Sequence, residues 1–394
     1  MHQEANQGEV IQLCQQLIQA QSLSGQEKEV IDRLAAFFSS KGIEHLTVDG
    51  YGSLMARIPG KRPGPTLLFD GHVDTVPVPD PQAWTRPPFE GQIDQGRLYG
   101  RGASDMKGAV SAMAVAAAHF LQETEGDFAG TLIIAGVVQE EVFEGVAARS
   151  ISEACQPDLV IIGEATELNL NIGQRGRAEI KLETFGVPAH SANPKKGVNA
   201  VYLMTDVIKE MAKIKPPQDP YLGPGILELT DIKSSPYPGA SVVPSHCLVT
   251  YDRRLLPEET EVSVMEALCQ ALENVDLPDP RASLQASFAL GKETCYTGQV
   301  MEAQRFFPGW RFDQDQWFVT QAREGLQQAG FSTPLSHYNF CTNGSHYAGE
   351  AGIPTLGFGP SLESLAHTID EYIEIEQLLK AKEGYQAIRE VFLK

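Results

Sequence analysis

Three apolar runs stand out in the first half of the chain, and each ends abruptly at an acidic or imidazole side chain. They cover residues 67–69, 131–138 and 159–162 and are rich in Leu, Ile and Val. Short runs without polar alternation are typical of strands covered on both faces. A nearly all-apolar, Ala-rich stretch at 109–120 predicts a buried helix between the first two runs. The pattern therefore predicts an α/β fold with a mainly parallel sheet.

The N-terminal part of the chain predicts two helices followed by a hairpin. Residues 9–38 show helical spacing with a break at 22–25. Ser24 and Glu27 have the spacing of a capping box at the start of the second helix. The segment 46–58 contains two strand-like pieces joined by Asp-Gly-Tyr-Gly, which is a hairpin signal.

The patterning changes at residue 176 and changes back after residue 290. The intervening segment predicts strand, helix, strand, strand, helix and strand in that order, which is typical of a small ferredoxin-like α+β domain. Buried α/β patterning then resumes, so this domain is interpreted as an insertion. Its predicted elements are 177–185, 198–213, 225–232, 247–253, 262–273 and 282–289, and the later ones are 315–329, 353–358 and 374–392.

Composition narrows the classes of function. A chain of 394 residues favours two domains or one large domain with an insertion. The formal net charge of −20 argues against nucleic acid or an anionic membrane as a partner, because both require a basic face. No apolar run approaches membrane-spanning length, and the N-terminus shows no secretory signal. The six cysteines lack C-x-x-C spacing and are expected to be reduced thiols of a cytoplasmic protein.

Candidate metal ligands follow the predicted strands and turns. The carboxyl ends of parallel strands meet at one edge of a sheet, so these side chains are expected to cluster there. A set of imidazoles and carboxylates without thiolates suits one or two divalent ions, Zn²⁺ first and Co²⁺ or Mn²⁺ next. The candidates are His72, Asp105, Glu140, Glu141, Glu164 and His367.

Two local patterns refine this expectation. Asp74 follows His72 closely enough to fix the tautomer of its ring. Glu140 and Glu141 are adjacent at a strand end and point in different directions, so one can bind an ion while the other acts as a base on water. For this pair alone a solvated acidic rim is the alternative. The glycines around residue 101 are interpreted as a tight turn that aims Asp105 inward, because the motif of a phosphate loop is missing.

A series of motifs runs along nearly the whole chain: Gly71-His-Val-Asp-Thr-Val-Pro77, Gly100-Arg-Gly-Ala-Ser-Asp-Met-Lys-Gly108, Gln139-Glu-Glu141, Gly163-Glu164, Pro188-Ala-His-Ser-Ala192 and His367. In this order they resemble the M20 family of metallopeptidases and deacylases, which includes acetylornithine deacetylase, succinyl-diaminopimelate desuccinylase and carboxypeptidase G. Further motifs are Gly173-Gln-Arg-Gly-Arg177, Asp252-Arg-Arg254, Tyr296-Thr-Gly298, Phe340-Cys-Thr-Asn-Gly344 and Gly357-Phe-Gly-Pro360. Through these the chain is most similar to a subgroup of hydrolases linked to selenium metabolism.

The resemblance implies a role for each candidate. One metal would be held by His72 and Glu164 and the other by Glu141 and His367, with Asp105 bridging them. The same resemblance makes Glu140 the general base and Asp74 the residue that orients His72. It also implies a cis peptide bond after Asp105.

The inserted segment and a late loop supply further candidates. The resemblance implies that residues 1–175 and 291–394 form a catalytic domain and that 176–290 form a lid and dimerisation domain. His190 would reach the partner subunit's site in a homodimer, and Arg254 would bind a substrate carboxylate, although an exposed lid arginine is an equal alternative. Asn343 and Gly344 lie in a loop that departs from the family pattern and is expected to line the substrate pocket. His346 in the same loop is expected at the surface, at the start of a helix, and contact with the substrate is the alternative.

These features predict a metal-dependent amide hydrolase. The expected substrate is a small N-acyl or N-carbamoyl amino acid with a free carboxylate, and Glu140 would activate water for attack on its carbonyl. A dipeptidase or aminopeptidase of the same family is the first alternative. A catalytically inactive binding member is the second, although none of the expected ligands is missing.

Overall fold

The computed structural model describes residues 2–277 and 279–393, with side chains from residue 8 onward. The chain divides into two compact units, which are described separately. Unit 1 comprises Met1–Gln174, Lys292–Ala303 and Trp310–Lys394, whereas unit 2 comprises Arg175–Gly291 and Gln304–Gly309. No pattern in the sequence marked the return of 304–309 to unit 2.

Unit 1 is built on a mixed sheet of nine strands among the described residues. Its centre is parallel, because β6, β3, β7 and β20 run in one direction, while antiparallel strands flank it on both sides. The predicted α/β class is confirmed. The strands in sheet order are β1 (His45–Val48), β2 (Leu54–Pro59), β6 (Ala129–Val137), β3 (Arg62–His72), β7 (Leu159–Ile162), β20 (Thr355–Gly357), β8 (Leu170–Gln174) and β18 (Trp310–Arg311), with β19 (Leu335–Tyr338) beside β8.

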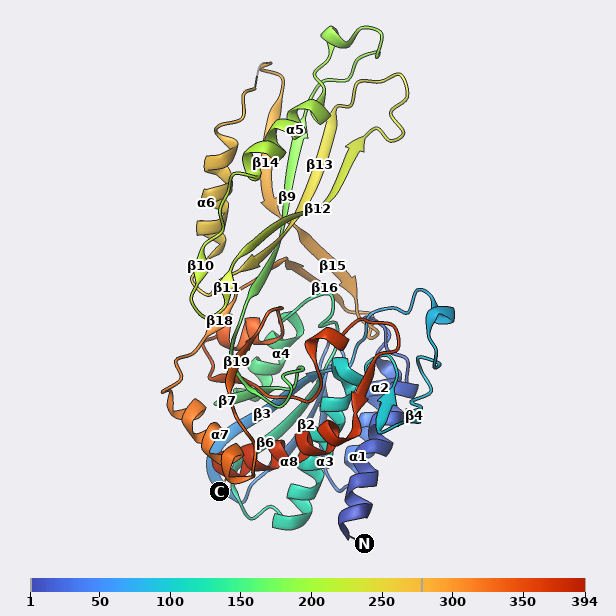
Figure 1. Cartoon of the computed structure of the whole chain (residues 1–394), viewed down its shortest axis with the longest axis vertical. Coiled ribbons are helices and arrows are strands. Elements are labelled where there is room, and N and C mark those ends of the chain that lie inside the picture. Colours follow the sequence, from blue (N-terminus) through green and yellow to red (C-terminus); the bar gives the residue numbers. More distant parts are fainter. Residues whose placement is uncertain (1, 278, 394) are drawn as a thin grey trace. The chain divides into compact units, whose positions relative to one another are not determined.

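Helices bury both faces of this sheet. Leu67 and Phe69 of β3 belong to a cluster that includes buried residues of α1, α2, α3 and α8, and Figure 1 shows α8 running beside α3. Leu68 is also completely buried and points to the opposite face, because side chains alternate along a strand. The helices of unit 1 are α1 (His2–Gln19), α2 (Lys28–Ser40), α3 (Gly108–Thr124), α4 (Val146–Cys155), α7 (Trp317–Gln328) and α8 (Ile375–Phe392).

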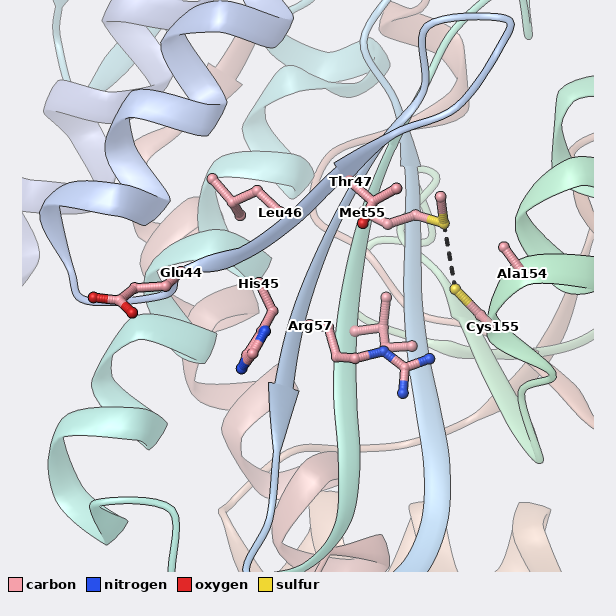
Figure 2. Close-up of a pocket in the computed structure, with 9 residues that line it drawn as sticks. Glu44, His45, Leu46, Thr47, Met55, Arg57, Ala154 and Cys155 are labelled. Atoms are coloured by element: carbon pink, nitrogen blue, oxygen red, sulfur yellow. Dashed lines mark hydrogen bonds between the residues drawn. The ribbon is translucent and has the colours of Figure 1, made fainter.

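A cavity of about 430 Å³ opens on the face opposite α3, beside the end of α4 (Figure 2). Its wall includes Ile133, the register partner of Leu68. The Cys155 thiol lies 3.4 Å from the Met55 sulfur, and burial raises the pKa of Cys155. None of the predicted metal ligands lines this cavity.

Five further strands form two small sheets. β21 (Tyr372–Glu374) pairs with β5 (Arg97–Tyr99), which pairs with β4 (Ile93–Asp94). β15 (Leu290–Thr294) pairs with β16 (Val300–Gln304). No helix of the described residues is long and apolar enough to cross a bilayer.

Unit 2 has the element order predicted for residues 176–290. Its sheet has the order β12-β13-β9-β14, which gives the antiparallel arrangement of a ferredoxin-like sandwich. Alternate residues of β9 and β13 are buried against α5 and α6. The elements are β9 (Gly176–Phe185), α5 (Ala200–Met211), β10 (Gln218–Asp219), β11 (Gly223–Pro224), β12 (Ile226–Ser235), β13 (His246–Leu255), α6 (Glu261–Leu272), β14 (Ser283–Phe288) and β17 (Phe306–Phe307), the last of which pairs with β9.

One local prediction was wrong. The two N-terminal helices and the hairpin are present, but Ser24 and Glu27 form no capping box. Glu27 itself occupies the N-cap position, and the Ser24 hydroxyl donates instead to Asp74, 50 residues away. The spacing of Ser24 and Glu27 therefore accompanies a long-range contact and does not form a helix cap.

The central strand generates a stability prediction. Phe69 is fully buried and its ring centroid lies 5.4 Å from that of Tyr385 in α8. Phe69→Ala is expected to lower the free energy of unfolding of the metal-free protein by about 3–5 kcal/mol, because it leaves a cavity under α8. Urea denaturation measures the change. The matched control is Val48→Ala in β1, where the side chain is 48% exposed and a change within about 0.5 kcal/mol is expected. A loss below about 1 kcal/mol for Phe69→Ala would contradict the packing described.

Candidate active site

Acidic and imidazole side chains meet at the carboxyl ends of the parallel strands of unit 1. His72 is the last residue of β3, and Glu164 lies two residues beyond β7. Glu140 and Glu141 follow β6 after a short turn. Because these strands are neighbours in the sheet, their ends deliver four potential ligands to one place.

Asp105 reaches this place from an irregular segment before α3. The turn at Gly102 has φ 85°, which is favourable for glycine, and Asp105 has non-helical angles of φ −126° and ψ 93°. The peptide bond between Asp105 and Met106 is cis, as the resemblance implied. The predicted inward aim of Asp105 is therefore realised by a turn that interrupts regular structure.

The Asp105 carboxylate lies between two histidines. Its Oδ1 is 2.8 Å from Nε2 of His72, and its Oδ2 is 3.1 Å from Nε2 of His367. Each histidine also faces a second carboxylate. Nε2 of His72 lies 3.4 Å from Oε1 of Glu164, and Nε2 of His367 lies 2.9 Å from Oε2 of Glu141. The arrangement offers two adjacent sets of donors that share Asp105.

These donors fit divalent metal ions. Donor atoms of His72, Glu140 and Glu164 lie within 4.8 Å of one another, and so do those of His72, Asp105 and Glu141. Imidazole and carboxylate ligands suit Zn²⁺ and similar ions. Oε1 of the buried Glu140 has no hydrogen-bond partner within the described part of the chain. The buried acidic groups outnumber the imidazoles, so bound cations would offset unfavourable charge.

The pKa values of the acidic groups reflect this crowding. Burial raises the pKa of Glu140 well above its usual range, and the charges of Glu164 and its other acidic neighbours add to the effect. Burial, aided by the charge of Asp105, raises the pKa of Glu141 to about 7. Hydrogen bonds to Asp105 and Glu141 raise the pKa of His367 to about 10. Without bound cations, these groups therefore retain protons. Metal ions would displace those protons on binding.

Asp74 organises the site through both its carboxylate and its main chain. Its carbonyl oxygen accepts a hydrogen bond from Nδ1 of His72 at 2.9 Å, which leaves Nε2 facing the carboxylates. Its carboxylate accepts the backbone N–H groups of Glu140 and Glu141, each at 3.1 Å. The carboxylate oxygen nearest the His72 ring is 3.6 Å away. The carboxylate thus holds the turn after β6, while the carbonyl group orients His72.

Two further buried carboxylates support the site and were not among the predicted site residues. Oε1 of Glu27 accepts the backbone N–H groups of Gly25 at 2.8 Å and Gln139 at 3.2 Å, and burial raises the pKa of Glu27 to about 7. Glu371 binds the turn that carries Asp105. The only sequence signal for Glu371 was its position four residues after His367.

The two loop residues predicted to bind substrate make internal contacts. Asn343 is 2% exposed, its Nδ2 donates to Oδ1 of Asp70 at 2.9 Å, and its Oδ1 accepts the Gly145 N–H at 3.0 Å. The N–H of Gly344 donates to Oγ1 of Thr342 at 3.0 Å. A Cβ at position 344 would lie 2.5 Å from the indole nitrogen of Trp310. These contacts join β3, α4 and the loop.

The surface position expected for His346 was wrong. His346 is 9% exposed. Its Nε2 lies 2.6 Å from Oγ of Ser152, and its Nδ1 lies 2.8 Å from Oε2 of Glu350. The short π-helical segment Ser345–Glu350 is thereby attached to α4. The local sequence could not reveal this, because Ser152 is 194 positions away.

The remaining two candidates lie in unit 2. His190 is exposed, and its Nδ1 accepts the N–H of Ala192 at 3.0 Å. The neutral ring therefore carries its proton on Nε2, which can act as a donor. Arg254 lies on β13, its Nε donates to Oδ1 of Asp252 at 2.8 Å, and its side chain is 30% exposed.

Asn343→Ala tests the structural role of the loop. Removing the amide leaves the buried Gly145 N–H and one oxygen of Asp70 without a partner, so the free energy of unfolding is expected to fall by about 1–3 kcal/mol. Urea denaturation of the metal-free protein measures this loss. Asn339→Ala is the control, because that exposed amide bonds only Glu363 among the described residues and should have little effect. Unchanged stability together with a raised KM would favour the substrate-binding role instead.

Comparison with known proteins places these residues in a family. Residues 68–390 match the sequence profile of the peptidase family M20/M25/M40. The Escherichia coli protein YgeY, described as uncharacterized, is 30% identical over 390 residues, which cover 97% of this chain and 94% of that protein. A succinyl-diaminopimelate desuccinylase of Cereibacter sphaeroides is 32% identical over 393 residues, with coverage of 96% and 97%.

A solved structure shows the same fold. The Bacillus subtilis YXEP protein, described as a dinuclear metal binding peptidase from the M20 family, superposes with a TM-score of 0.73 at 15% sequence identity. The alignment covers 98% of each chain. The family match spans most of the chain and includes every candidate ligand. This chain therefore belongs to the M20/M25/M40 peptidase family and is a hydrolase that acts on amide bonds.

Proposed function

We propose that this enzyme removes the acyl or carbamoyl group from a small N-acyl or N-carbamoyl amino acid with a free carboxylate. The observation that carries the proposal is the Asp105 carboxylate between His72 and His367, each beside a further carboxylate. Such a shared carboxylate suits two neighbouring ions. Support also comes from full-length relatives described as desuccinylases, which release an acyl group from an amino acid.

His72 and Glu164 would hold one divalent ion, and Glu141 and His367 would hold the other. Asp105, whose carboxylate lies between the two histidines, would be shared by both ions. Zn²⁺ is proposed first, with Co²⁺ or Mn²⁺ as alternatives, because the donors are nitrogen and oxygen only. Bound there, two ions would activate water near neutral pH and stabilise negative charge on the substrate carbonyl oxygen.

Glu140 is proposed as the general base. It is buried beside the ligands, and its Oε1 has no partner among the described residues, so this oxygen is available to accept a proton. It would take a proton from the attacking water and pass it to the leaving amine. Asp74 supports this role, because its carboxylate fixes the backbone N–H of Glu140.

Unit 2 is proposed to supply two donors to the substrate. Nε2–H of His190 would stabilise the carbonyl oxygen in the partner subunit's site, which requires a homodimer. Arg254 would bind the substrate carboxylate through its terminal nitrogens, since its Nε is already paired with Asp252. We also propose a cytoplasmic location, with the six cysteines unpaired as found in the structure.

A dipeptidase or aminopeptidase activity is the second candidate. It is favoured by the fold neighbour described as a peptidase, and the same ligands would serve either reaction. Zinc-loaded protein should be screened against acetyl-, succinyl-, formyl- and carbamoyl-amino acids and against dipeptides, with amine release as the signal. Cleavage of dipeptides alone would support the second candidate. Stoichiometric substrate binding without turnover would support an inactive binding member.

Glu140→Gln is expected to abolish turnover and leave the metal content near that of the wild type. Loss of a general base lowers kcat by about 10² to 10⁴, and the same group also protonates the leaving amine. Steady-state kinetics and elemental analysis of the purified variant measure the two quantities. Glu141→Gln is the matched control and should lower the occupancy of one ion. Stoichiometric metal loss from Glu140→Gln would mean that the roles of these neighbours are exchanged.

The proposed role of His190 can be tested by mixing two inactive variants. In a heterodimer of Glu140→Gln and His190→Ala, one site carries both lesions and the other carries none if His190 serves the partner's site. Activity should then return, up to about half of the wild-type value per heterodimer when the sites are independent. Mass spectrometry must show that heterodimers have formed. If His190 acts within its own chain, the mixture stays as inactive as its parents.

A further inference from the structure

Glu371 binds the turn that carries Asp105 with both of its carboxylate oxygens. Its Oε1 accepts the backbone N–H groups of Ser104 at 2.9 Å and Asp105 at 3.1 Å. Its Oε2 accepts Nη1 of Arg101 at 2.6 Å. The main-chain carbonyl of Glu371 also accepts the N–H of Gly100 at 2.9 Å. Glu371 is completely buried, and its bonds to Ser104 and Arg101 are buried with it.

This turn depends on a side chain from another segment for its hydrogen bonds. Asp105 and Met106 have non-helical angles, so the N–H groups just before α3 cannot be satisfied by a regular turn of helix. A buried N–H without a partner is costly, and a carboxylate is a strong acceptor. Glu371 therefore fixes the backbone at Asp105, from which the shared carboxylate projects.

Glu371 is also close in sequence to the second histidine. His367 precedes it by four residues, and both belong to the segment that leads from 361 into β21. The His367 side chain is 53% exposed, whereas that of His72 at the end of β3 is 1% exposed. His72 is positioned by the sheet. His367 and Asp105 lie on irregular segments, and Glu371 joins those two segments directly.

We infer that Glu371 is a positioning residue for the Asp105, Glu141 and His367 half of the site, and that it controls the affinity of that half for its ion. The inference rests on the proposed two-metal hydrolase. The half formed by His72 and Glu164 follows from two adjacent strands of the sheet and depends less on Glu371. Asp105 would also be shared by the ion at His72 and Glu164, so loss of Glu371 is expected to weaken both ions, and the ion at Glu141 and His367 much more strongly.

Glu371→Gln tests this without removing the side chain. The amide oxygen can still accept the Ser104 and Asp105 N–H groups, but the amide nitrogen replaces the oxygen that accepts from Arg101. The new amide N–H group and the Arg101 guanidinium then face each other as two donors in a buried place. Zinc retained per folded chain is measured by elemental analysis after equilibration with a chelator at a series of free zinc concentrations. We expect retention to fall from two ions to one, with affinity for the second ion reduced about 10- to 100-fold.

Two variants serve as controls. Glu374→Gln alters a carboxylate three residues later that pairs with Arg97 at 2.8 Å and is 39% exposed, and it should retain two ions. Glu141→Gln removes a proposed ligand of the same ion and should reproduce the loss. Glu371→Asp keeps the charge but is too short to reach Ser104, Asp105 and Arg101 together. If Glu371→Gln does not fold, Glu371→Asp takes its place and should show the same loss of the ion at Glu141 and His367.

The outcomes separate the inference from the proposed function. Retention of two ions with wild-type affinity by both Glu371 variants overturns the role of Glu371 and leaves the two-metal hydrolase intact. Equal weakening of both ions, or a lower melting temperature with unchanged ions per folded chain, also overturns it, because either result indicates general support of the fold. Failure of the wild-type protein to bind two ions overturns the proposed function and this inference together.

Discussion

The concentration of buried negative charge at one edge of the sheet is the constraint on which the site depends. Water is largely excluded there, so each carboxylate that stays ionised needs a cation or several donors. The structure meets this need in part by raising pKa values, most clearly at Glu140 and Glu141. Two shared cations would meet it fully. The crowding of negative charge would therefore favour metal binding.

A second set of buried carboxylates accepts hydrogen bonds from the main chain. Asp74 accepts the N–H groups of the turn after β6, Glu27 accepts those of residues 25 and 139, and Glu371 accepts those before Asp105. Each turn leaves regular structure where it must present a side chain, and so loses the hydrogen bonds of a helix or sheet. Long-range carboxylates replace those bonds, which makes the geometry of the site depend on contacts far apart in sequence.

The difference between residues at strand ends and residues that support the turns explains which parts of the site could be predicted from the sequence. The apolar runs of β3, β6 and β7 are continuous, so both the parallel centre and the ligands at the strand ends could be inferred. The supporting residues carry no comparable periodic signal. Ser24 and Glu27 have the spacing of a capping box, yet they bond Asp74 and Gln139. His346 looked like a surface residue because its partner Ser152 lies on a distant helix.

The candidate substrate-binding residues of the two units differ in what they contact. Asn343 and Gly344 depart from the family pattern, but the Asn343 amide and the Gly344 N–H are engaged within unit 1. These hydrogen bonds favour a structural role for the loop. In unit 2, by contrast, His190 has a protonated Nε2 and Arg254 has a partly exposed guanidinium. Under the proposed function, the candidate ligands of unit 1 would set the reaction, and residues such as His190 and Arg254 would contribute to the choice of substrate.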